Sequence, residues 1–181
     1  SKLEESIPIQ VSPRFKKNLN IWISPYSFSR INYQNSILIY QKIWDLCQLI
    51  EGKNKYILFG RDLYYPLKIL DDIENADSIY GITHCPITYR DIIEDKNTNL
   101  SSNCHLVEKK NYCPTMEDYM TDTGYVLVLT AGRNGLGKTI CQMLLDHKDK
   151  IKQIVYIGCN TTNMKKDFTR LKELYTIREV Y

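Results

Sequence analysis

From Lys55 to the C-terminus, the chain alternates short, nearly continuous apolar segments with segments of helical character. The apolar segments are Tyr56–Phe59, Ser78–Ile82, Tyr125–Leu129 and Ile154–Ile157. Strands that are apolar on both faces and joined by helices are typical of a parallel sheet that helices cover on both sides. The pattern therefore predicts an α/β fold with a mainly parallel sheet.

The N-terminal part of the chain has a different character. Residues 1–18 are polar and interrupted by prolines, so we expect them to be irregular. Residues 19–24 alternate enough to form a short strand. In residues 35–52 the apolar side chains recur at spacings of three and four, which predicts an amphipathic helix. We therefore expect an N-terminal extension with a first strand, residues 1–34, followed by one α/β domain, residues 35–181.

The composition narrows the class of protein. The chain has 181 residues, of which 43% are hydrophobic and 25% charged, as in globular domains. The net charge of +3 is compatible with an RNA-binding face but does not require one. The six cysteines form neither a C-x-x-C pair nor a zinc-binding spacing, and no apolar run is long enough to span a membrane. We expect a protein of the cytoplasm or another reducing intracellular compartment, without a metal ion or a membrane segment.

One glycine-rich stretch matches a nucleotide-binding motif. "GRNGLGKT", from Gly132 to Thr139, fits the P-loop pattern G-x-x-x-x-G-K-[ST]. In a P-loop NTPase, Lys138 would reach the phosphates of the nucleotide and Thr139 the magnesium ion. However, the next strand ends in Gly158-Cys159-Asn160, where no carboxylate supports Mg²⁺. A P-loop NTPase stays open as an alternative to a glycine-rich turn that begins a helix.

Five segments between Ile21 and Tyr181 carry motifs that occur in the same order in one enzyme family. They are "ISPYSFSRIN", "YILFGRDLYYPL", "IYGITHCPITYRDIIEDKNTN", "VLVLTAGRNGL" and "IVYIGCNTTNMKKDFTRLKELYTIREV". The corresponding family patterns are "isPxsFfQxN", "DLYCGxGxfsL", "vxGiExxxxAvxxAxxNaxxN", "xDPPRxGL" and "ivYvSCNPxTLaRDlxxLxxxY". The last segment is the most specific, because its Tyr, Cys-Asn, Asp and Leu positions all agree. The chain thereby resembles the catalytic domain of the RNA (uracil-5-)-methyltransferases, which modify tRNA and rRNA.

The resemblance implies a fold and a cofactor. The expected fold is a class I S-adenosylmethionine-dependent methyltransferase-like, or Rossmann-like, three-layer sandwich, and S-adenosylmethionine is the implied methyl donor. Arg133 falls on the arginine of the family's "RxGL" motif. The Gly132–Thr139 loop is then the substrate-side turn after the fourth strand, and its match to the P-loop pattern is a coincidence.

The same resemblance assigns roles to individual residues. Cys159 occupies the position of the catalytic nucleophile, and Arg133 stands in the substrate-side loop. In this chemistry a thiolate adds to carbon 6 of uracil, and the resulting enolate attacks the methyl sulfonium. The positive residues of an RNA-binding face would be Arg14, Lys16, Lys17, Arg30, Arg133, Lys165, Lys166 and Arg170, with Tyr26 and Phe28 stacking on bases. Solvated charges and core aromatic residues are the competing interpretation of this set.

The sequence departs from the family pattern at the functional positions. Gly60 keeps the first glycine of the cofactor loop, but Asp62 replaces the second and would obstruct the ligand. Thr83 stands where an acidic residue binds the ribose hydroxyls, and Thr130-Ala131-Gly132 replaces Asp-Pro-Pro. Arg30 replaces a glutamine. The family's catalytic base lies beyond the segment that matches Tyr181. We therefore expect weak or absent binding of S-adenosylmethionine.

These observations leave two functional hypotheses. The favoured one is a degenerate methyltransferase-like domain that serves as an RNA-binding or protein-binding module. The alternative is an active RNA (uracil-5-)-methyltransferase that is completed by a partner chain or by a C-terminal segment. Binding of S-adenosylmethionine distinguishes the two hypotheses.

Overall fold

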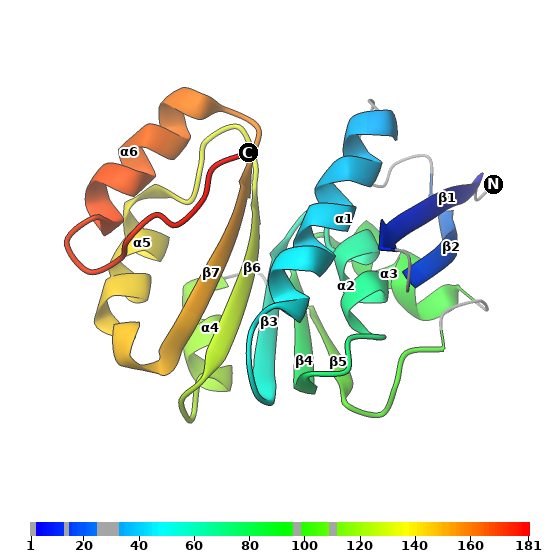
Figure 1. Ribbon diagram of the computed structural model, residues 1–181, viewed down its shortest axis with the longest axis horizontal. Helices are drawn as coiled ribbons and strands as arrows, with labels where there is room; N and C mark the ends of the chain where they lie inside the picture. Colours follow the sequence, from blue (N-terminus) through cyan, green and yellow to red (C-terminus); the bar gives the residue numbers. More distant parts are fainter. Residues whose placement is uncertain (1–2, 13–14, 25–32, 96–98, 109–111) are drawn as a thin grey trace.

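The computed structural model describes residues 3–12, 15–24, 33–95, 99–108 and 112–181. Its centre is a five-stranded parallel sheet with the strand order β5-β4-β3-β6-β7 (Figure 1). The strands are β3 (Asn54–Gly60), β4 (Ala76–Thr83), β5 (Cys104–Glu108), β6 (Tyr125–Ala131) and β7 (Ile151–Gly158). All four segments predicted as strands lie within these elements, and the predicted parallel sheet is confirmed.

Helices cover both faces of this sheet, as the sequence predicts. One face carries α1 (Tyr33–Gln48), α2 (Tyr64–Leu70) and α3 (Pro86–Glu94). The other face carries α4 (Tyr112–Tyr119), α5 (Gly137–Asp146) and α6 (Thr161–Leu171), and a short 3-10 helix, η1 (Lys148–Lys150), precedes β7. The α4 helix has no counterpart among the predicted elements.

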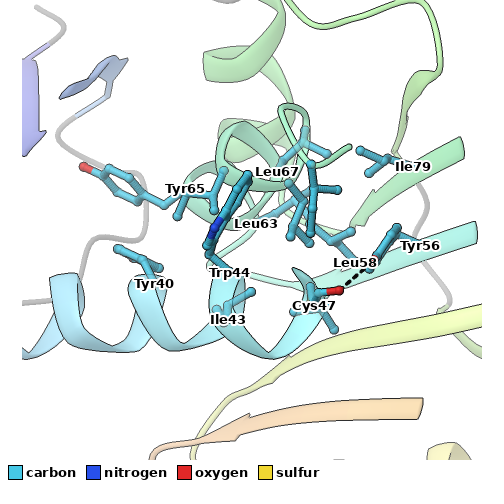
Figure 2. Packing of buried hydrophobic residues seen from close by; sticks show 14 of the residues in the cluster. Tyr40, Ile43, Trp44, Cys47, Tyr56, Leu58, Leu63, Tyr65, Leu67 and Ile79 are labelled. Atoms are coloured by element: carbon cyan, nitrogen blue, oxygen red, sulfur yellow. Dashed lines mark hydrogen bonds between the residues drawn. The ribbon is translucent and has the colours of Figure 1, made fainter. Parts of the chain in front are cut away.

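The central strands are apolar throughout because each contributes to two cores. In β3, Tyr56 and Leu58 point into the core under α1 and α2, whereas Ile57 and Phe59 point into the core under α5 and α6. Figure 2 shows the first core, where Trp44 of α1 packs near residues of α2. The alternation follows the two-residue period of a strand and explains why both faces of β3 had to be apolar.

The expectation of an irregular N-terminus is wrong. Residues Leu3–Ser12 form β1 and Phe15–Ile23 form β2, and the two strands pair as an antiparallel hairpin. The hairpin packs on α1 and α3, and the backbone N–H of Ser24 donates a 2.6 Å hydrogen bond to Asp91 in α3. Pro8 is tolerated because, among the strands that the structure describes, β1 pairs only with β2, so one edge of β1 needs no backbone donor.

The cysteines whose side chains are described are free thiols: Cys47, Cys85, Cys104, Cys141 and Cys159. Within the described residues, no group of three or more His, Cys, Asp or Glu side chains is arranged to hold a metal ion. None of the helices in the described part of the chain combines the length and apolar character needed to cross a bilayer.

Candidate functional site

The candidate site lies at the carboxyl edge of the sheet, where the order of the strands reverses. Phe59 of β3 pairs with Ile82 of β4, and Gly60 pairs with Thr130 of β6. In this register Thr83, Gly60 and Thr130 lie next to one another on three neighbouring strands, which are about 4.8 Å apart. Open α/β sheets bind their ligands at such a reversal point. The structure thus brings three of the predicted cofactor positions together.

Gly60 is held against its neighbour Thr130. The backbone at Gly60 has a φ of +134°, and a Cβ atom there would clash with both the hydroxyl and the carbonyl oxygen of Thr130. The Thr130 hydroxyl donates a 3.0 Å hydrogen bond to the carbonyl oxygen of Phe59. The glycine is therefore required by the close approach of β6, and the Thr130 side chain bonds to the sheet itself.

Asp62, at the second glycine position of the family, is 5% exposed. Its carboxylate accepts a 2.9 Å hydrogen bond from the hydroxyl of Tyr40 in α1. The ring of Tyr40 stacks on Tyr65 of α2 with a centroid separation of 5.0 Å. Asp62 thus ties the loop after β3 to α1, a role that the sequence did not suggest.

Thr83, which we predict to stand at the position of the ribose-binding acidic residue, is completely buried. Its hydroxyl oxygen accepts a 3.1 Å hydrogen bond from the backbone N–H of Cys85, in the turn that leads into α3. A buried hydroxyl that stabilises a turn supplies neither the charge nor the accessible oxygen that ribose hydroxyls need. Thr83 therefore does not fit the role of a ribose-binding acidic residue.

Cys159 is exposed directly after β7, at the carboxyl edge of the same sheet. The preceding Gly158 packs against Met164, because a Cβ atom at position 158 would lie 2.6 Å from the Cγ and Sδ atoms of that side chain. The following Asn160 caps α6 by accepting a 3.1 Å hydrogen bond from the backbone N–H of Asn163. The predicted nucleophile position is thus accessible at the N-terminal end of a capped helix.

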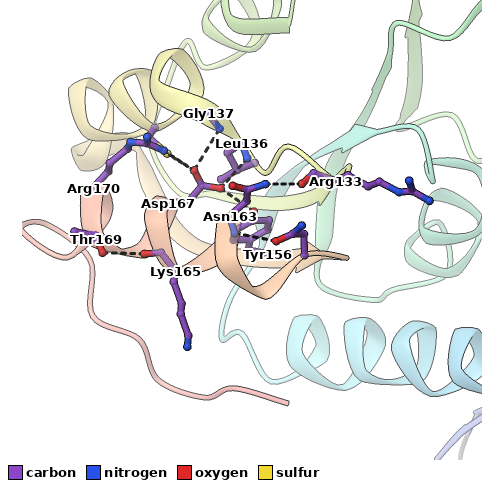
Figure 3. A network of polar contacts seen from close by, with 11 residues as sticks. Arg133, Leu136, Gly137, Tyr156, Asn163, Lys165, Asp167, Thr169 and Arg170 are labelled. Carbon is purple, nitrogen blue, oxygen red and sulfur yellow. Dashed lines mark hydrogen bonds and ion pairs between the residues drawn. The ribbon is translucent and has the colours of Figure 1, made fainter.

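The loop between β6 and α5 is fixed by Asp167 of α6, which is 1% exposed (Figure 3). The Asp167 carboxylate accepts hydrogen bonds from the backbone N–H groups of Leu136 and Gly137, at 2.8 and 3.3 Å. It also accepts hydrogen bonds from the hydroxyl of Tyr156 and from Nη1 of Arg170, both at 2.9 Å.

This arrangement argues against a P-loop. A P-loop binds phosphate with the backbone N–H groups at the beginning of its helix. Here the N–H groups of Leu136 and Gly137 already donate to a carboxylate of the same chain. Gly135 lies so close to Asp167 that an added Cβ would overlap the carboxylate. The loop that matches the pattern is therefore filled by the protein's own anion.

Asp167 was not predicted as a functional or structural centre. A signal was present, because Asp167 lies three residues after Met164 and four before Leu171, on the inward face of α6. A carboxylate on that face needs buried donors.

The groups around Asp167 have shifted pKa values. Burial raises the pKa of the Cys141 thiol to about 11, and the negative charge of Asp167 contributes to the same shift. Burial, assisted by the hydrogen bond to Asp167, also raises the pKa of Tyr156.

The structure places the predicted RNA-binding residues in different surroundings. Lys165 and Lys166 are exposed on α6, whereas Arg170 is 33% exposed and forms an ion pair with Asp167. Arg133 is exposed in the loop after β6, and Figure 3 shows its side chain extending away from Asp167. Its carbonyl oxygen accepts a 2.7 Å hydrogen bond from Asn163.

The remaining residues of that predicted set lie beyond what the structure describes. Arg14, Tyr26, Phe28 and Arg30 fall outside the described residues, and the side chains of Lys16 and Lys17 are likewise not described.

Comparison with known proteins identifies the class to which this fold corresponds. No protein-family model matches the chain. The chain is similar in structure to the tRNA (uracil-54, C5)-methyltransferase of Pyrococcus abyssi in complex with S-adenosyl-L-homocysteine. That match has a TM-score of 0.66 and 15% identity over 94% of this chain and 38% of that one. A second match, to an NADB-Rossmann superfamily protein of Streptococcus agalactiae, has a TM-score of 0.52 and 15% identity over 82% of this chain and 61% of that one. The chain therefore has the class I methyltransferase-like, Rossmann-like α/β fold.

Sequence similarity points to a narrower group. The chain is 26% identical to an uncharacterized RNA methyltransferase of Staphylococcus aureus over 166 residues, which is 87% of this chain. It spans about a third of the length of that relative, since the match covers 34% of it. The resemblance to RNA methyltransferases that the motifs predict is confirmed.

Proposed function

We propose that this chain is a degenerate RNA (uracil-5-)-methyltransferase domain that acts as an RNA-binding module. Residues 35–181 form its methyltransferase-like domain and residues 1–34 its N-terminal extension, and it works in the cytoplasm or another reducing intracellular compartment. The observation that carries the proposal is Thr83, an uncharged and fully buried residue at the position where the family binds the ribose of its cofactor.

The expected loss of cofactor affinity follows from this position. Hydrogen bonds to a charged group contribute about 1.5–3 kcal/mol each, so losing one carboxylate acceptor weakens binding roughly tenfold to a hundredfold. Asp62 and Thr130 are both bonded within the protein, to Tyr40 and to Phe59, and neither replaces the missing acceptor. We therefore expect binding of S-adenosylmethionine to be weak or absent.

Three observations support RNA as the ligand. The similar Staphylococcus aureus protein is described as an RNA methyltransferase. The net charge of this chain is +3, and Lys165 and Lys166 are exposed on α6 near the carboxyl edge. Unpaired surface cations of this kind bind the phosphates of nucleic acids and make the affinity depend on salt.

A fluorescence-anisotropy titration of labelled single-stranded RNA tests this function. We expect saturable binding that weakens as the salt concentration rises. Absence of binding at low salt would refute the RNA-binding function, and capture of a specific protein instead would favour a protein-binding module.

A second candidate is an active methyltransferase that is completed by a partner chain or by a C-terminal segment. The observation that favours it is the exposed Cys159 at the carboxyl end of β7. RNA that contains 5-fluorouracil tests it, because a working nucleophile would form a stable covalent adduct. We expect no adduct, with or without S-adenosylmethionine. An RNA–protein band on a denaturing gel that disappears in Cys159→Ala would favour the enzyme.

A further inference from the structure

Two arginines follow adjacent strands at the carboxyl edge of the sheet. Arg61 comes directly after Gly60 of β3, and Arg133 comes two residues after Ala131, which ends β6. Because Gly60 pairs with Thr130, the two arginines follow the ends of neighbouring strands, at the point where the strand order reverses. We call Arg61 and Arg133 the arginine pair.

The side chains of the arginine pair are exposed, and within the described residues neither forms an ion pair or a hydrogen bond. Two other cations are neutralised: Lys55 pairs with Asp122 at 2.7 Å, and Arg170 pairs with Asp167. The charge of the arginine pair is therefore available to a ligand.

The positions around the arginine pair hold fewer carboxylates than the family pattern does. The two positions that are acidic in the family, 83 and 130, hold threonines, and the carboxylate of Asp62 is buried against Tyr40. His84 follows Thr83 on the other side of Arg61, and burial together with the positive charge of Arg61 lowers the pKa of His84. Glu108, at the end of β5, is exposed one strand beyond Thr83 and bounds the region.

We propose that the arginine pair binds a phosphate group at the place where the methyltransferase family holds its cofactor. Guanidinium groups suit this ligand because their planar N–H donors match the oxygen atoms of a phosphate. Replacing the acidic residues at positions 83 and 130 by threonine removes the charge that would repel it. The inference rests on the proposed function in taking the phosphate to be part of an RNA backbone. A free nucleotide offers the same chemistry, and the experiment separates the two.

The experiment compares a double variant, Arg61→Gln with Arg133→Gln, with the wild-type chain in the RNA anisotropy titration. The matched control is the double variant Arg90→Gln with Lys148→Gln. Like the arginine double variant, this control removes two positive charges, here from an exposed residue of α3 and an exposed residue of η1. Thermal melting confirms that both variants fold. In a second arm, the same proteins are titrated with uridine monophosphate instead of RNA.

For single strands, each phosphate contact contributes about 0.7 to the slope of log affinity against log salt. Losing two contacts should reduce the slope by about 1.4 and weaken RNA binding about 25-fold at 0.1 M salt. The control double variant should change the affinity less than about threefold. If the wild-type chain binds RNA and both double variants bind it equally well, the arginine pair is not the site.

The second arm separates the inference from the proposed function. Binding of uridine monophosphate but not RNA, lost in the arginine double variant, would support the phosphate site and refute the RNA-binding function. Binding of neither ligand would overturn both.

Discussion

Replacing Asp167 tests whether one buried carboxylate holds the loop between β6 and α5. In Asp167→Ala the backbone N–H groups of Leu136 and Gly137 lose their acceptor. Each stranded donor costs about 1.5–2 kcal/mol, so the free energy of unfolding should fall by about 3–4 kcal/mol. The ion pair with Arg170 adds little, because that side chain is 33% exposed and can turn into water.

Urea denaturation followed by circular dichroism measures this loss. Asp146→Ala is the matched control, since Asp146 is an exposed residue of α5 that accepts one hydrogen bond from Gln142. We expect the control to change the free energy of unfolding by no more than about 0.5 kcal/mol. If Asp167→Ala costs less than about 1 kcal/mol, the carboxylate does not hold the loop as we infer.

Two further predictions concern packing and pH. Gly60→Ala should lower the free energy of unfolding by at least about 2 kcal/mol, because its methyl group would overlap Thr130. Gly132→Ala, where a Cβ meets open space, is the control, and equal urea midpoints for the two variants would disprove the clash. Burial raises the pKa of Cys141 to about 11 and that of Cys104 to about 12, from 9.0 for an ordinary thiol. Above pH 9.0 the unfolded chain therefore binds fewer protons than the folded one, and stability should decrease from there to about pH 11. A melting temperature that stays constant or rises over this range would contradict the assignment.

The sheet could be predicted from the sequence because its central strands are buried on both faces. A continuous apolar run such as Tyr125–Leu129 has few alternatives to a core strand. The N-terminal hairpin could not be predicted in the same way. Its first strand is polar, and its hydrogen bonds come from residues up to 20 positions away, as in the pairing of Leu3 with Ile23. Local composition does not report such pairing.

The candidate site was predictable in position but not in detail. The alignment with the family placed Gly60, Thr83 and Cys159 at the carboxyl edge, and the strand register accounts for that grouping. The contacts that decide what the site can bind join distant elements. Asp62 bonds to a tyrosine 22 residues earlier, and Asp167 bonds to backbone groups about 30 residues earlier. Only the packing of α1 on the β3 loop, and of α6 on the β6 loop, creates these contacts.

Calorimetric titration of the chain with S-adenosylmethionine tests the central claim most directly. The claim is that this methyltransferase-like fold no longer holds the family's cofactor, because Thr83 is uncharged and buried and Asp62 is bonded to Tyr40. We predict that the titration shows no saturable heat in the micromolar range. Saturable binding with a micromolar Kd would contradict the claim and favour a working methyltransferase.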